Sequence, residues 1–350
     1  MTEATSSRSA AIVPATPPAG GPQDDCTPAA WAEIDALRRA MHSAFVGQQQ
    51  MVEMLWVALL SGGHLLIEGP PGLAKSSSLE LLAAGLEGPV RWQQVSPDMD
   101  PARLLEQADA TAADDPDAAG TDRWPASLLI IEGMEQATAG VDLAINRILK
   151  PRRPNTGIGD QVPGTGAILV MATRNPSDAA APLPSWFDSF AFCVQPRFPG
   201  YAAERAILRR SRQAFRTGLM PQQPGAPVPP RVGPAAIRAA RQQILDLHLS
   251  PDLEGYLVHL VMATRVPATY HRDLVGWLGG GVSPRATLAL ERGARAKAWL
   301  DGRDYVAPED IQWIAPAVLR HRIRLTDAAT ADGRTPDDYI ANWLARVPIP

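Results

Sequence analysis

The chain has 350 residues, of which 45% are hydrophobic and 20% charged, a composition typical of a folded protein with about two domains and not of a disordered chain. Its 33 basic side chains stand against 37 acidic ones, a net charge of −4, so a broadly basic surface for nucleic acid is excluded. No basic and then apolar leader opens the chain, and the most apolar stretch, 54–67, is too short for the roughly 20 residues of a membrane helix. We therefore expect a cytoplasmic protein with no nucleic-acid and no membrane partner.

The first part of the chain alternates helical and strand-like segments. Residues 1–25 are rich in Ser, Ala, Pro and Gly and predict a disordered tail. Beyond them the apolar spacing predicts helices at 31–44, 49–60 and 75–86, and strands at 65–67, 127–131 and 167–171. The strand runs are continuously apolar, as in parallel strands covered on both faces. The pattern predicts an α/β domain with a central parallel sheet, which we assign to residues 26–210.

The composition changes after this domain. Prolines crowd residues 220–234, where they fix φ and remove backbone donors, so we expect a linker over 211–235. Almost everything that follows has helical periodicity, with helix-start patterns at Ser283-Pro284 and Thr335-Pro336. We expect a small all-helical domain over 236–350.

One lysine marks the candidate site. The chain has only three lysines against 30 arginines, and Lys75 follows an apolar run and a Gly/Pro-rich turn. The segment from Gly69 to Ser76 matches the P-loop pattern G-x-x-x-x-G-K-[ST] except at Ala74. Such a loop wraps backbone N–H groups around phosphates at a helix N-terminus. The predicted ATP-binding residues are Gly69, Pro70, Pro71, Gly72, Leu73, Ala74, Lys75 and Ser76.

Each P-loop side chain has a defined chemical task. Lys75 would place a compact positive charge against the β- and γ-phosphates, and Ser76 would give its hydroxyl to Mg²⁺. Ala74 is compatible with the loop if its position does not require the φ of glycine. The competing interpretation, an ordinary turn, is disfavoured because a strand precedes and a helix follows.

Several motifs in order resemble the MoxR-type AAA+ ATPases, a P-loop NTPase family. They are Val46-Gly47-Gln48, the stretch from Gly62 to Ser76, the segments 94–98, 171–176 and 182–184, then Ser283-Pro284-Arg285-Ala286, 302–310 and 319–322. The family commonly has Ala before the P-loop Lys. The resemblance covers residues 30 to 326 and implies an AAA+ core with a helical lid. It also implies that Asn175 is sensor 1, which positions the attacking water, and that Arg285 is sensor 2, which reaches the phosphates.

The Walker B strand departs from the family pattern. In the family this strand ends in Asp-Glu, an acid for Mg²⁺ and an acid that polarises water. Here the alignment with Met134 and the residues after it puts Glu132 at the metal position, beside Ser76, and Gly133 at the catalytic position. A register shifted by one would make Glu132 the base, but it needs a gap and abandons the metal carboxylate. In either register one acid is missing.

The arginine finger is also missing. Where the family has Asp-Arg-Phe, this chain has Asp188-Ser189-Phe190. An arginine finger contributes roughly 10³ to 10⁵ in rate in other NTPases, so hydrolysis should be very slow unless Arg174, Arg197 or Glu135 substitutes.

Three functions are compatible with these residues. The first is a MoxR-like ATPase that uses ATP and Mg²⁺ to remodel or activate a partner, with weakened hydrolysis. The resemblance implies a ring of this chain or of paralogous subunits, a hexamer, and a von Willebrand factor A-domain partner. The second is a catalytically impaired nucleotide-binding scaffold of the same fold. The third, a P-loop small-molecule kinase, is disfavoured by the Ser-Pro-Arg-Ala lid motif.

Overall fold

The structure, a computed structural model, describes residues 29–113, 128–150, 168–176, 184, 186–217, 229–270 and 274–349. The tail expected at 1–25, and Pro182 and Leu183 of the motif at 182–184, lie outside the described residues.

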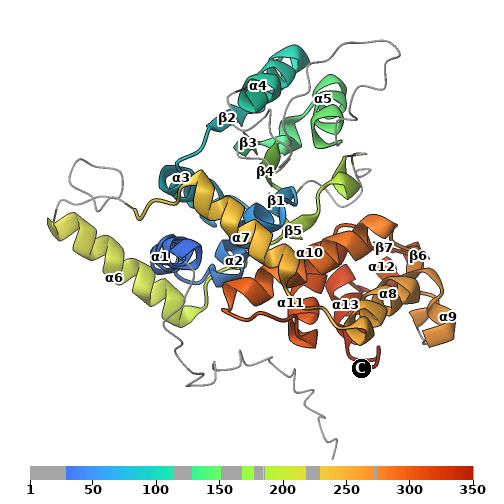
Figure 1. The fold of residues 1–350 in the computed structure, drawn as a ribbon. Helices are drawn as coiled ribbons and strands as arrows, with labels where there is room; N and C mark the ends of the chain where they lie inside the picture. The colour runs from blue at the N-terminus through green and yellow to red at the C-terminus, as the bar shows by residue number, and fades with distance from the viewer. Residues whose placement is uncertain are drawn as a thin grey trace, which may run out of the picture.

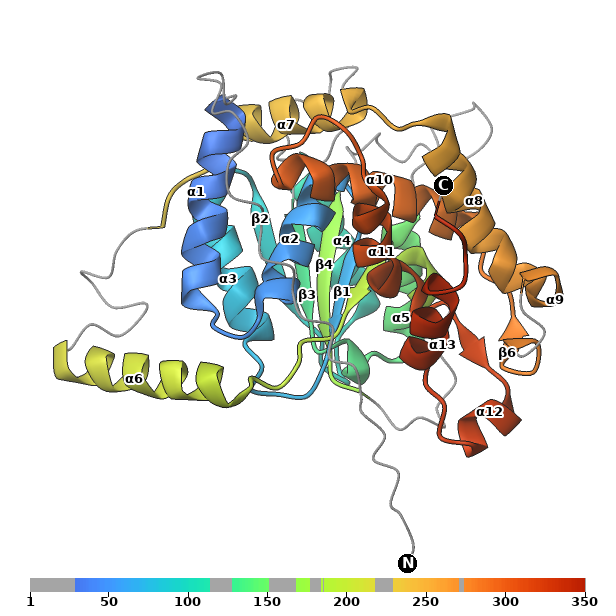
Figure 2. The same ribbon diagram turned by 90° about the horizontal axis from the view of Figure 1, so that it is seen from below.

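A five-stranded parallel sheet forms the centre of the molecule, in the order β2-β3-β4-β1-β5 (Figures 1 and 2). Its strands are β1 (Leu65–Glu68), β2 (Val90–Gln94), β3 (Leu128–Glu132), β4 (Leu169–Arg174) and β5 (Phe192–Val194). The strands expected around 65, 127 and 167 are therefore confirmed. Since β1 lies between β4 and β5, the loop after β1 opens at the carboxyl end of the sheet, beside the end of β4.

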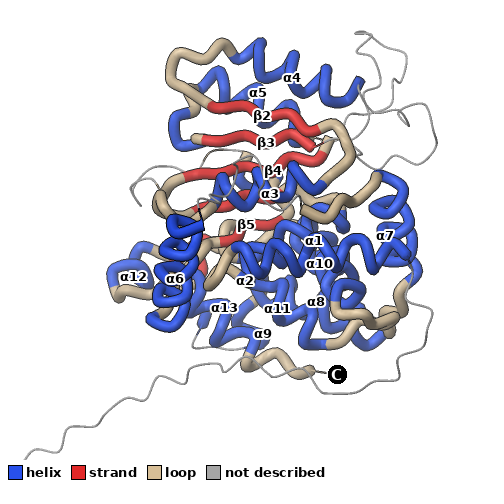
Figure 3. Tube along the Cα trace, turned by 90° about the vertical axis from the view of Figure 1, so that its left-hand side faces the viewer, coloured by secondary structure: helices blue, strands red, loops and turns tan. Residues whose placement is uncertain are grey.

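Helices cover both faces of the sheet, which explains why the inner strands β1, β3 and β4 are largely apolar, whereas the edge strand β2 contains Arg91 and two glutamines. On one face Leu65 and Ile67 pack with α1 (Ala29–Ala44), α2 (Gln49–Ser61) and α3 (Lys75–Gly85). On the other face Leu66 belongs to a second cluster under α4 (Pro101–Ala113) and α5 (Ala139–Leu149). In Figure 3 the strands lie one above another, with α4 and α5 beyond β2.

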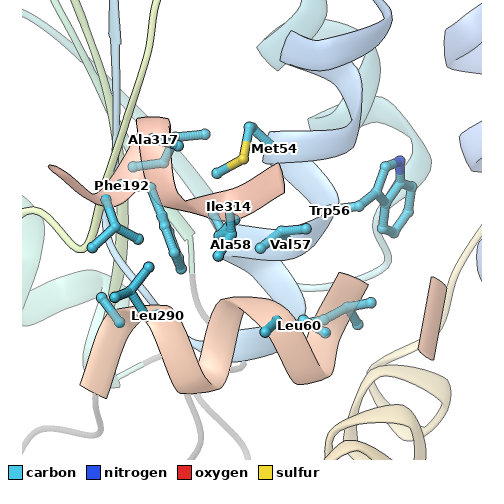
Figure 4. Close-up of a cluster of buried hydrophobic side chains, with 14 of the residues drawn as sticks. Met54, Trp56, Val57, Ala58, Leu60, Phe192, Leu290, Ile314 and Ala317 are labelled. Carbon is cyan, nitrogen blue, oxygen red and sulfur yellow. The ribbon is translucent and has the colours of Figure 1, made fainter. Parts of the chain in front are cut away.

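The C-terminal region is a helical lid that packs on the first face. Its elements are α7 (Pro234–Asp246), α8 (Pro251–Arg265), α9 (Pro267–Tyr270), α10 (Pro284–Leu300), α11 (Pro308–Leu319), α12 (Asp327–Ala331) and α13 (Pro336–Leu344). In Figure 4, Leu290 of α10 and Ile314 of α11 lie with Met54 and Val57 of α2 and with Phe192 of β5. The core and lid thus share one continuous hydrophobic cluster.

The lid also contains a short antiparallel pair, β6 (Leu278–Gly280) with β7 (Arg324–Leu325), so the region is helical but not entirely so. The boundary expected at residue 210 falls inside α6 (Tyr201–Thr217), a helix that projects from the body in both ribbon views (Figures 1 and 2).

Thr335 caps α13 as expected, whereas Ser283 precedes α10 without a capping side-chain bond. No helix among the described residues is long and apolar enough to cross a membrane.

Candidate nucleotide-binding site

The predicted phosphate loop joins the end of β1 to the start of α3. Gly72 in this loop has φ +85°, a conformation that favours glycine. Ala74 has φ +60° and ψ +25°, and it is the one non-glycine residue with positive φ among those described. Position 74 is therefore left-handed, in the small region that residues other than glycine can also enter. An L-residue can adopt this region at a cost of about 1 to 2 kcal/mol, so alanine is tolerated with some strain.

Lys75 folds back over its own loop. Its Nζ donates to Gly69 O at 2.5 Å, to Pro70 O at 2.8 Å and to Asn175 Oδ1 at 3.0 Å. Burial lowers the pKa of this ammonium, while the nearby carboxylates of Glu135 and Glu132 act in the opposite direction. The charge is thus held at the loop by oxygen acceptors, the same kind of atom that a phosphate presents.

Ser76 and Glu132 meet at the start of α3. The Ser76 hydroxyl donates to Glu132 Oε1, and the Trp92 indole donates to Glu132 Oε2 at 2.8 Å. No group of three or more His, Cys, Asp or Glu side chains able to hold a metal occurs in the described part of the chain. Mg²⁺ bound with a nucleotide needs only one or two protein oxygens, because water and phosphates complete its shell. The paired hydroxyl and carboxylate therefore fit Mg²⁺.

Gly133 occupies a turn that disfavours any side chain. Its φ is +74°, and a Cβ at this position would lie 2.6 Å from Gln94 Nε2 and 3.3 Å from Val95 O. A glutamate at this position would thus be strained and would begin against β2. The position aligned with the catalytic acid has a backbone suited to glycine.

Glu135 holds Asn175 from the short helix η1 (Met134–Gln136). Its Oε1 accepts from Asn175 Nδ2 at 2.6 Å, and its Oε2 accepts from the Asn175 backbone N–H at 3.0 Å. Through Asn175 Oδ1 the same network reaches Lys75. The structure therefore brings together Lys75, Ser76, Glu132 and Asn175, because β3, β4 and β1 are neighbours and their loops share one edge.

Arg285 is not joined to this group. Its Nη1 lies 3.3 Å from Asp188 Oδ2, and 54% of its side chain is exposed. Ser283 also contacts Asp188, which explains its missing cap, and Arg322 Nε donates to Asp188 Oδ1 at 3.1 Å. Within the described residues no hydrogen bond connects Arg285 to the phosphate loop.

Sequence reasoning did not assign a role to Trp92 or Asp188. The indole of Trp92 reaches Glu132 because β2 and β3 pair in register, with Trp92 opposite Ile130. Asp188 lies beside Ser189 in the helix η2 (Phe187–Ser189), and its link to the lid spans about a hundred residues of sequence. Neither contact has a local sequence pattern that could have revealed it.

The fold and this site define the class of the protein. A five-stranded parallel sheet, a phosphate loop after its inner strand β1 and a helical lid together are those of an AAA+ ATPase. A family model for the AAA lid domain matches residues 278–343, and a model for the MoxR domain in MoxR-vWA-beta-propeller ternary systems matches residues 32–94.

Whole-chain comparisons give the family. Chaperone MoxR1 of Mycobacterium tuberculosis is 32% identical over 328 residues, which are 91% of this chain and 84% of the relative. Protein MoxR of Methylorubrum extorquens is 27% identical over 84% of this chain and 89% of its own length. The solved structure of a candidate ATPase from Cytophaga hutchinsonii superposes with a TM-score of 0.73 at 27% identity, covering 92% of this chain and 96% of the other. The chain belongs to the MoxR family.

Proposed function

We propose that this protein binds ATP with Mg²⁺ at the Gly69–Ser76 loop and uses the bound nucleotide to remodel or activate a partner protein. The observation that carries the proposal is the convergence of Lys75, Ser76, Glu132 and Asn175 in one hydrogen-bonded group. Lys75 would neutralise charge on the β- and γ-phosphates, and Ser76 and Glu132 would hold Mg²⁺, which would supply further positive charge to the same phosphates. Asn175 positions the attacking water.

Hydrolysis by this chain alone is proposed to be slow. Gly133 provides no carboxylate, and Ser189 provides no guanidinium for a neighbouring active site. Ordinary enzymes turn over about ten times per second, and loss of an arginine finger costs roughly 10³ to 10⁵ of that rate. We expect about 10⁻² s⁻¹ or less.

The proposed assembly is a hexameric ring of this chain or of paralogous subunits, acting on a von Willebrand factor A-domain partner. The name of the family model that matches residues 32–94 supports such a partner. A paralogous neighbour with an intact arginine finger would restore what Ser189 cannot supply.

Lys75→Ala tests the nucleotide site. Binding of a fluorescent ATP analogue with Mg²⁺ should weaken about 100-fold, because one charged hydrogen-bonding group worth about 1.5 to 3 kcal/mol is lost. Lys150→Ala, an exposed lysine at the end of α5, should bind like the parent protein. Equal binding by Lys75→Ala and the parent, or no binding by the parent, would contradict the proposal.

A second candidate, a nucleotide-locked scaffold, is favoured by the loss of both catalytic positions. Incubation of the purified protein with ATP separates the two. A scaffold retains intact ATP indefinitely, whereas the slow ATPase converts it to ADP and phosphate at a rate that Lys75→Ala abolishes. Turnover near 1 s⁻¹ by the homomer would contradict both candidates, because both assume that Gly133 and Ser189 remove catalytic groups.

A further inference from the structure

One carboxylate in the site has no chemical role in the proposed function. Glu135 follows the end of β3 by three residues, and both of its oxygens bond to Asn175, at 2.6 Å and 3.0 Å. Asn175 in turn contacts Lys75 at 3.0 Å. An acid is therefore present one side chain away from the proposed phosphate position, although it does not stand at position 133.

The backbone explains why the acid is displaced. The left-handed turn at Gly133 places its would-be Cβ against Gln94 and Val95, on the side of β2. The turn continues directly into η1, where Gln136 N donates to Gly133 O at 2.9 Å. This compact helical turn carries Glu135 toward β4, whose last residue, Arg174, precedes Asn175.

The other nearby carboxylate, Glu132, already has partners for both of its oxygens. Both oxygens of Glu132 are bonded, one by Ser76 and one by Trp92. Glu132 therefore faces the proposed metal position, while Glu135 faces the proposed water-positioning amide. The electrostatic contact with Lys75 also places Glu135 within the field of the phosphate-binding charge.

We propose that Glu135 is the base for the attacking water and replaces the glutamate missing at position 133, and that Asn175 holds it in the form without nucleotide. This inference rests on the proposed function. Asn175 turns toward the γ-phosphate when ATP binds, which frees one Glu135 oxygen to accept a proton from water.

The chemical step balances without another reactant. The water oxygen forms a bond to the γ-phosphorus, and the bond from that phosphorus to the β–γ bridging oxygen breaks, leaving its electron pair on ADP. One water proton passes to Glu135 and then to solvent, which regenerates the carboxylate.

Glu135→Gln separates this role from a structural one. The amide oxygen of glutamine can still accept a hydrogen bond from Asn175, but glutamine cannot take a proton. In a single-turnover assay with Mg²⁺ and saturating protein in excess over ATP, cleavage should fall about 100-fold, the lower range for loss of a general base. Affinity for the fluorescent ATP analogue should stay within twofold. Glu106→Gln, an exposed glutamate of α4, is the matched control and should cleave ATP at the parental rate.

The outcomes of this assay separate the role of Glu135 from nucleotide binding itself. Parental cleavage by Glu135→Gln, or loss of its binding together with its cleavage, overturns the role of Glu135 while leaving nucleotide binding by the parent intact. Absence of ATP binding by the parent overturns the proposed function itself.

Gly133→Glu in the Glu135→Gln protein gives a second test. If the double variant regains cleavage, a carboxylate at position 133 reaches the water, and the account of why the acid is displaced to Glu135 is wrong. We expect no recovery, because the backbone at position 133 has a φ of +74° and a Cβ there would lie 3.3 Å from the Val95 carbonyl oxygen. Nucleotide affinity of the double variant, measured in parallel, reports that its site is still formed.

Discussion

Two kinds of arginine contact join the helical lid to the core, and they differ sharply in burial. Arg241 of α7 and Arg322 before β7 are buried, and each donates to core carbonyls, to Leu59 O at 2.5 Å and to Phe190 O at 2.6 Å respectively. Arg285 is more than half exposed and pairs only with a carboxylate, Asp188, among the described residues. The buried arginines donate mainly to backbone carbonyls, whereas Arg285 contacts a partly exposed carboxylate that Arg322 also binds.

The difference indicates which part of the lid is fixed. Burial lowers the pKa of both Arg241 and Arg322 to about 10, although Asp188 opposes the shift at Arg322, so desolvation is part of the cost of these contacts. Removing such a group leaves buried acceptors unpaired. An exposed pair contributes about 0 to 1 kcal/mol. The body of the lid is therefore anchored, and Arg285 can leave Asp188 at little cost.

The largest expected effect on stability is at the buried Arg322. Arg322→Met should lower the free energy of unfolding by about 3 kcal/mol, because the Ala191 carbonyl and the Asp188 carboxylate lose this buried donor and the Phe190 carbonyl keeps only its bond to His321. Urea unfolding followed by tryptophan fluorescence measures this change. The exposed Arg324→Met, two residues away, is the control and should change it by less than 0.5 kcal/mol, roughly the limit for an isolated surface site. Equal free energies of unfolding for Arg322→Met and Arg324→Met would show that buried and exposed contacts do not differ in strength.

Glu53 of α2 belongs to a largely buried charged group that contacts the last residue of α10 in the lid. It accepts from Arg38 Nη2 at 2.8 Å and bonds to His42, and Arg38 also donates to Leu300 O of α10 at 2.6 Å. Burial alone would raise the pKa of Glu53, but the His42 hydrogen bond and the Arg38 charge outweigh it and lower the pKa to about 2.

The sign of the pH effect follows from that shift. A carboxylate whose pKa is depressed in the folded state stabilises it above the unfolded value near 4.5, and this stabilisation is lost as the pH falls toward 2. Glu53→Gln should thus cost about 2 kcal/mol at pH 7 and flatten the loss of stability between pH 5 and 2. Free energies of unfolding of the parent and of Glu53→Gln, measured from pH 7 to pH 2, test this prediction, with Glu106→Gln as control. Parallel pH profiles for parent and Glu53→Gln would show that this contact carries no net charge stabilisation.

Sequence patterns predicted the main elements because apolar periodicity and helix-start residues are local. The strand residues 65–67 and 128–131 are buried on both faces of the sheet, so their apolar runs indicate strands without ambiguity. The pair β6 and β7 was not predicted, since Leu278-Gly279-Gly280 has no strand-like alternation and pairs only when Arg324 is brought beside it.

The site could be predicted where topology alone brings residues together. Lys75, Glu132 and Asn175 follow neighbouring parallel strands, so their convergence follows from the strand order. The attachment of Arg285 to Asp188 depends on how the lid sits on the core. A sequence pattern contains none of this information.

The smallest expected effect on stability is at Arg285. Arg285→Ala should change the free energy of unfolding by less than about 1 kcal/mol, because only an exposed pair is lost. If Arg285 moves to the γ-phosphate when ATP binds, the same variant should weaken ATP binding about tenfold, roughly one charged hydrogen bond less the pair broken at Asp188, and leave ADP binding unchanged. Arg292→Ala, exposed on the same helix, is the control for both measurements. Equal weakening of ATP and ADP would place Arg285 away from the γ-phosphate, and a loss of stability as large as that of Arg322→Met would mean that the exposed pair, too, anchors the lid.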